Sequence, residues 1–113
     1  MSDQINWLGD YQAGLEQAQA DNKLLLLELY MDGCPHCARL HKETHGDPQV
    51  IQEINKRFIP VRLEGRSYMD VVNQFEVKGA PTTLILSSQG QEQRRIVGFH
   101  TPSDYLKELA AVA

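Results

Sequence analysis

Two cysteines are the residues with the clearest chemistry, and they lie in the segment Cys34-Pro35-His36-Cys37. They are the only cysteines in the chain. The segment follows an apolar run and precedes a stretch that reads as a helix opening at Cys34. At a helix N-terminus, unpaired backbone N–H groups and the positive end of the dipole favour a thiolate over a thiol. The spacing therefore predicts a reactive cysteine beside a second thiol.

A purely structural disulfide is the first alternative for this cysteine pair. In the chain-entropy model, a ring this short gives about 2 kcal/mol of stability, against about 4.7 kcal/mol for a loop of roughly 100 residues. So short a bridge constrains the unfolded chain very little. We therefore expect the bond between Cys34 and Cys37 to be a reversible one.

A metal site is the second alternative, because two histidines follow the cysteines. Cys37, His41 and His45 are spaced i, i+4, i+8 on one helix face, and C-x₂-C-x₃-H resembles part of a zinc site. Pro35 and a helix that begins at Cys34 instead favour a redox geometry. We expect no metal and no cofactor other than a redox-active Cys34–Cys37 disulfide.

The elements that position the cysteines alternate between helices and strands. Apolar spacing, caps and turn residues predict strands over residues 23–31, 58–63, 83–88 and 94–99. They predict helices over residues 8–20, 34–45, 68–75 and 101–112, with a further helical piece that begins at Pro48. The four leucines at 24–27 predict a central strand buried on both faces. Residues 1–6 are expected to form a loose start.

The length and composition of the chain limit the number of domains, the kinds of partner and the cellular compartment. The 113 residues, 42% of them hydrophobic, predict one globular domain over residues 1–113. A formal net charge of −4 argues against nucleic-acid binding, and no apolar run is long enough for membrane insertion. Residues 1–20 are too polar for a signal peptide, which indicates a cytoplasmic protein, or a periplasmic one if a signal peptide has been removed. We expect a monomer.

Three features make the sequence resemble the thioredoxin superfamily. They are the Cys-Pro-His-Cys segment after a strand, the turn Gly79-Ala80-Pro81-Thr82, and Gly98 after the last strand. The resemblance implies an α/β thioredoxin fold, with a central mixed sheet of about four strands flanked by helices. It also implies a cis Pro81 packed against the cysteines. The substrate-binding residues that it implies are Gly33, Pro35, Ala80, Pro81 and Gly98.

The resemblance is strongest to short thioredoxin-like domains of bacterial thiol–disulfide proteins, but two positions depart from thioredoxin. Gly33 stands where thioredoxin has Trp, and Pro35-His36 stands where it has Gly-Pro. The Pro-His pair is similar to that of the periplasmic oxidase DsbA, whose helical insertion has no room here. We expect His36 to stabilise the Cys34 thiolate. The resulting reduction potential should lie between about −270 mV for thioredoxin and about −120 mV for DsbA.

Glu28 is an acid inside the apolar run, six residues before Cys34. Thioredoxin-like proteins often carry a buried acid at this spacing, so the resemblance implies a catalytic role, with a solvated acid as the alternative. We expect a buried, poorly paired carboxyl that exchanges a proton with Cys37. Arg62 is expected either close to Glu28 or as a solvated surface residue.

The function that follows is that of a thiol–disulfide oxidoreductase. Cys34 would attack, Cys37 would resolve, and the partners would be protein thiols or disulfides and an upstream redox partner. The sequence leaves reductase, oxidase and isomerase open. A non-catalytic thioredoxin-like module that only binds a partner, and the Cys/His metal-binding domain, are the alternatives.

Overall fold

A four-stranded mixed sheet forms the centre of the computed structural model, which describes residues 3–112. Its strand order is β2-β1-β3-β4. The bounds are β1 (Leu24–Tyr30), β2 (Phe58–Glu64), β3 (Thr82–Leu86) and β4 (Glu92–Val97). β1 pairs with β2 in parallel and with β3 antiparallel, and β4 pairs antiparallel with β3. The predicted mixed sheet is therefore confirmed.

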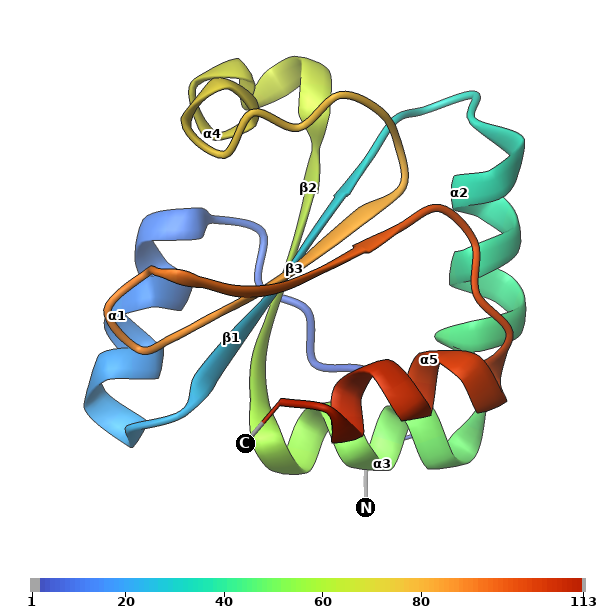
Figure 1. Cartoon of the computed structure of the whole chain (residues 1–113), viewed down its shortest axis with the longest axis horizontal. Coiled ribbons are helices and arrows are strands. Elements are labelled where there is room, and N and C mark those ends of the chain that lie inside the picture. Colours follow the sequence, from blue (N-terminus) through green and yellow to red (C-terminus); the bar gives the residue numbers. More distant parts are fainter. Residues whose placement is uncertain (1–2, 113) are drawn as a thin grey trace.

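Helices cover both faces of this sheet (Figure 1). One face carries α1 (Tyr11–Asp21) and α4 (Met69–Gln74), which follows the short 3₁₀ turn η2 (Gly65–Ser67). The other face carries α2 (Pro35–Arg39), the π-helix η1 (Leu40–Thr44), α3 (Pro48–Arg57) and α5 (Pro102–Ala110). No helix within residues 3–112 is long and apolar enough to cross a membrane.

β1 contributes side chains to the hydrophobic cores on both faces of the sheet, as the run of leucines predicted. Leu26 joins the core beneath α3 and α5, whereas Leu25 and Leu27 join the core beneath α1 and α4. All three side chains are fully buried. A central strand buried on both faces has no polar side to turn to water, which is why its sequence is almost continuously apolar.

The helix caps follow the sequence closely. The carboxylate of Asp10 accepts from the N–H of Ala13 at the start of α1. Asp47 caps α3, and Thr101 caps α5. α3 and α5 each continue with proline, whose fixed φ suits the first helical position.

Two local predictions are wrong. Residues 3–6 are not a loose start, because Ile5 is buried in the core and the Asn55 side chain hydrogen-bonds to the backbone of residues 4 and 6; residues 1–2 lie outside the described range. The first helix begins at Tyr11 instead of residue 8, since residues 7–9 run beside β2. The helix after Cys34 changes from α to π at Leu40, where the His45 N–H donates to the Leu40 carbonyl.

Candidate active site

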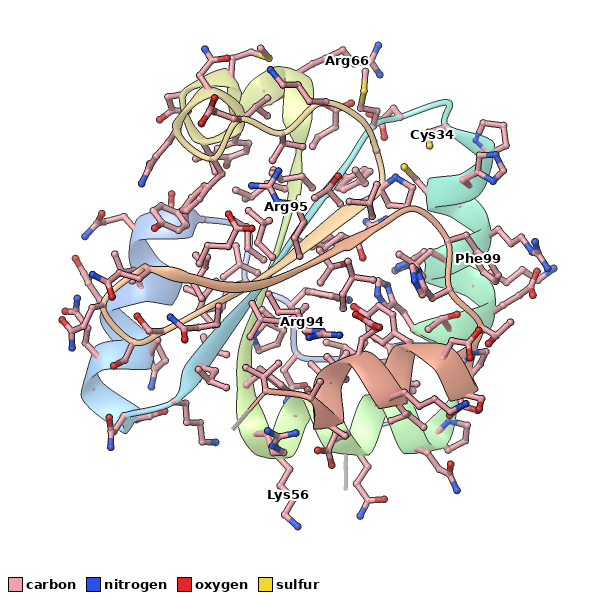
Figure 2. The ribbon with its side chains drawn as sticks, viewed as in Figure 1. Cys34, Lys56, Arg66, Arg94, Arg95 and Phe99 are labelled. Carbon is pink, nitrogen blue, oxygen red and sulfur yellow. The ribbon has the colours of Figure 1, made fainter. Side chains whose placement is uncertain are left out.

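Cys34 occupies the N-cap of α2, as the sequence predicted. Its backbone is extended, Pro35 takes the first helical position, and its Sγ accepts from the Cys37 N–H at 3.2 Å. Figure 2 shows Cys34 at the tip of the helix, at the edge of the molecule. A negative sulfur at this place is stabilised by a backbone donor and by the end of the helix dipole.

The turn before β3 faces this sulfur. The Ala80–Pro81 peptide bond is cis, as predicted. The Cys34 thiol donates to the Ala80 carbonyl, with the sulfur 3.7 Å from the oxygen. The Gly98 N–H donates to the Pro81 carbonyl at 2.8 Å, so the turn after β4 supports the turn before β3. Gly33 and Gly98 both adopt positive φ, at 82° and 83°, which favours glycine there.

Cys37 is the buried member of the pair, with 2% of its surface exposed. Both thiols are free. Burial, followed by the hydrogen bond with Cys34, raises the pKa of Cys37 to about 12, and the negative charge of Glu28 adds to the effect. Cys34 is only half-buried, so an approaching disulfide reaches Cys34 more readily than Cys37.

Glu28 is completely buried on β1, and its carboxylate lies close to two other side chains, Arg62 and His45. Its Oε2 accepts from Arg62 Nε at 3.1 Å. The Arg62 guanidinium lies over the Tyr30 ring, and the side chain is 18% exposed. The interpretation that places Arg62 near Glu28 is therefore confirmed. The expectation of a poorly paired carboxyl is wrong for Oε2, because the register places residue 28 of β1 opposite residue 62 of β2, but Oε1 has no hydrogen-bond partner among residues 3–112.

The second carboxylate oxygen of Glu28 faces His45, which is only 4% exposed. His45 Nε2 lies 3.0 Å from Glu28 Oε1, within ion-pair distance, although Oε1 has no hydrogen-bond partner among the described residues. The Tyr105 hydroxyl lies 3.4 Å from the same nitrogen and donates to Thr83 Oγ1 at 3.5 Å. The Trp7 ring packs edge-on against His45, with 5.0 Å between ring centroids.

The sequence did not reveal this buried cluster. It marked His45 only as a candidate metal ligand and did not single out Tyr105. The available signal was a histidine at a core-facing helical position, eight residues after Cys37 and within reach of the strand that carries Glu28. A buried polar atom without a partner costs about 1–3 kcal/mol of folding stability, so the unpaired atoms of this cluster destabilise the domain.

The other two histidines near the cysteines are exposed. The His36 side chain makes no hydrogen bond or ion pair within residues 3–112, so its influence on Cys34 stays a prediction. The pKa of His41 is lowered, mainly by desolvation and then by the positive charges of Arg62 and His45. Among the described residues, no group of three or more His, Cys, Asp or Glu side chains is placed to hold a metal ion.

Comparison with known proteins supplies the family. A family model for the thioredoxin-like domain matches residues 11–113. The chain is 33% identical over 110 residues to the thiol:disulfide interchange protein DsbD of Tatumella citrea. It is 34% identical over 87 residues to DsbD of Salmonella typhimurium. These matches cover 93% and 73% of this chain, but only 19% and 15% of those proteins.

Solved structures agree on the fold. A thioredoxin from Thermus thermophilus superposes with a TM-score of 0.86 at 23% identity, covering 96% of this chain and 86% of that one. The C-terminal domain of Neisseria meningitidis DsbD, in its oxidised form, gives 0.80 at 18% identity, covering 95% and 99%. With its cysteine pair in a C-x-x-C motif at the start of α2 and this match along almost its whole length, the chain belongs to the thioredoxin-like domain family.

Proposed function

We propose that the chain is a thiol–disulfide oxidoreductase that exchanges disulfides with protein substrates through Cys34 and Cys37. One observation carries the proposal. A half-buried Cys34 sulfur accepts a backbone hydrogen bond at a helix start, beside the Ala80 carbonyl, while the Cys37 thiol three residues on is buried. This asymmetry gives each sulfur a different step in the exchange.

The proposed exchange has two steps. The Cys34 thiolate attacks a substrate disulfide, forms a mixed disulfide, and releases one substrate thiolate. Cys37 then loses its proton and attacks Cys34, so that the Cys34–Cys37 bond forms and the second substrate thiolate leaves. The substrate gains two electrons and the cysteine pair loses two. The reverse sequence oxidises a substrate dithiol.

Substrate contacts are proposed for the surface around Cys34. Gly33 and Pro35 flank the sulfur in sequence, and the backbone of Ala80 is free of a strand partner just before β3. A pocket of about 240 Å³ opens beside Ala80, between the end of β1 and α4. Its lining is mostly apolar and includes Met31, Met69, Val72 and Val77. An extended peptide along Ala80 and Pro81 would place one apolar side chain in this pocket.

Glu28 and His36 are proposed as supporting groups. Glu28 is proposed as the base for the Cys37 proton, because it is completely buried and its negative charge contributes to the raised pKa of Cys37. His36 is exposed and makes no hydrogen bond to Cys34 among the described residues. We propose that it favours the Cys34 thiolate by its electrostatic effect on the sulfur.

An upstream redox protein is proposed as the second partner. The DsbD relatives are named for thiol:disulfide interchange, and this chain spans less than a fifth of their length. A domain of this family can therefore be one of several redox-active domains that transfer a disulfide from one to the next. We propose that a partner dithiol or disulfide resets the Cys34–Cys37 pair after each turnover.

The reduction potential tests the proposal in one titration. We expect equilibration with glutathione to interconvert the dithiol and a Cys34–Cys37 disulfide, at a potential between about −270 and −120 mV. Thiol alkylation followed by mass spectrometry measures the oxidised fraction at each glutathione ratio. A pair that never closes would mark a non-catalytic binding module, and a potential at or below that of thioredoxin would refute the oxidising character.

A further inference from the structure

The apolar pocket between the end of β1 and α4 is joined to the reactive sulfur by two residues of its lining. The Ala80 carbonyl accepts from the Cys34 thiol, and the Met31 carbonyl accepts from the Cys34 N–H at 3.2 Å. Both Ala80 and Met31 line the pocket. A substrate side chain that enters it therefore belongs to a residue close in sequence to the cysteine that Cys34 attacks.

Two methionines give this pocket an unusual lining. Met31 and Met69 are 38% and 50% exposed. Among residues 3–112, three large hydrophobic side chains are exposed, and these are two of them. Exposed apolar side chains that gather at one place mark a binding surface. Because a thioether sulfur makes favourable contacts with aromatic rings, this lining favours an aromatic side chain over an aliphatic one.

The volume of the pocket also suits an aromatic ring. An apolar cavity of about 150 Å³ holds benzene. This pocket measures about 240 Å³, which leaves space for the ring of phenylalanine, tyrosine or tryptophan. Gly65 is one of its lining residues, and a Cβ there would lie 3.5 Å from Val72 Cγ2, another lining atom. A larger residue at Gly65 would therefore take up space that the glycine leaves open.

Two cationic side chains, Arg66 and Lys78, border the same pocket. Arg66 is held in place, because its Nη2 donates to Glu64 Oε2 at 3.0 Å and to the Asp32 carbonyl at 2.8 Å. Figure 2 shows Arg66 at the same end of the molecule as Cys34. The face of an aromatic ring attracts a cation, whereas an aliphatic chain does not. The charges therefore add to the preference for a ring.

We propose that this pocket is a specificity site, which selects protein substrates that carry an aromatic side chain close to the reacting cysteine. The inference rests on the proposed disulfide exchange and names its substrate class. The residues of the pocket contact the neighbouring side chain and not the reacting sulfurs. They therefore change the rate for aromatic substrates and leave other substrates unaffected.

The test compares pentapeptides whose central cysteine forms a disulfide with nitrothiobenzoate. Phenylalanine or leucine replaces alanine at each of the other positions in turn. The Cys34 thiolate attacks the peptide sulfur, and nitrothiobenzoate leaves as a coloured thiolate. Each second-order rate constant is divided by that for glutathione, which removes differences in peptide reactivity. At the best position, we expect phenylalanine to react about tenfold faster than alanine and about threefold faster than leucine.

Three variants assign this preference to the pocket. Gly65→Val fills the space, and Met69→Ala removes an exposed thioether with little risk to the fold. Gly65→Val should bring the phenylalanine peptide to within about twofold of the alanine peptide, and Met69→Ala should reduce its advantage about threefold. The rate for the alanine peptide should stay unchanged in both. The control Val97→Thr alters an exposed apolar residue outside the pocket and should keep the full advantage.

Equal rates for the alanine and phenylalanine peptides at every position, or for leucine and phenylalanine at the best one, overturn the inference. So does an advantage for phenylalanine that Met69→Ala leaves intact, a result that decides the question even if Gly65→Val does not fold. The proposed function would fail in a different way. In that case no peptide, the alanine peptide included, would convert the reduced protein to the Cys34–Cys37 disulfide, which mass spectrometry detects.

Discussion

Replacement of Cys34 by Ser is expected to abolish disulfide exchange, with turnover lower by at least about 1,000-fold. A serine hydroxyl is not ionised near neutral pH and does not attack a disulfide, and Cys37 is too buried to replace Cys34. Reduction of insulin by dithiothreitol, followed as turbidity, measures the loss. The fold should survive, because the Cys34 side chain, within residues 3–112, hydrogen-bonds only to the Cys37 N–H as the cap of α2 and to the Ala80 carbonyl.

Cys37→Ser is the matched control for this prediction. It keeps the attacking sulfur and removes the resolving thiol, so a mixed disulfide between Cys34 and the substrate should accumulate. Gel electrophoresis without reductant detects this adduct. Turnover by Cys34→Ser at more than a few per cent of the original rate would contradict the assignment of Cys34.

Glu28→Gln is expected to slow the resolving step by about 100-fold near pH 7, the lower end of general acid–base effects. Glutamine keeps the shape of the side chain but does not accept the Cys37 proton. The attack by Cys34 should change by no more than about twofold. Reaction of the reduced protein with one equivalent of dithiobis(nitrobenzoate) releases one coloured nitrothiobenzoate when Cys34 attacks and a second when Cys37 resolves, so it measures both steps in one experiment.

The pH dependence distinguishes this effect from a distorted site. The pKa of Cys37 is raised to about 12, so the thiol loses its proton to hydroxide increasingly as the pH rises toward that value. The deficit of Glu28→Gln should therefore shrink with rising pH. A deficit that is constant with pH would contradict the role as a base. The surface variant Glu43→Gln, which alters only the exposed pair with Arg39, should show no deficit.

The architecture was predictable from the sequence because its signals are local. The leucine run of β1, the proline after each cap at Asp47 and Thr101, and the C-x-x-C spacing each depend on neighbours along the chain. The cis bond before Pro81 followed from the family resemblance. Each of these was confirmed.

The polar cluster could not be predicted in the same way, because it depends on strand register and helix rotation. Glu28 lies opposite Arg62 only through the parallel pairing of β1 and β2, residues that are 34 positions apart. His45 lies at the end of the π-helix η1, a rare conformation that the apolar spacing of the sequence does not predict, and 17 positions separate it from Glu28 in the chain. The N-terminal residues were misjudged for a related reason, since Ile5 is held by the core instead of by its neighbours in sequence.

The most direct test is limited alkylation of the fully reduced protein at neutral pH, with peptide mapping to identify the labelled cysteine. The difference in burial and the raised pKa of Cys37 predict that iodoacetamide modifies Cys34 first and leaves Cys37 nearly unlabelled. After oxidation, neither cysteine should react. Equal labelling of the two thiols, or preferential labelling of Cys37, would contradict the account of an attacking sulfur at the helix tip and a protected one behind it.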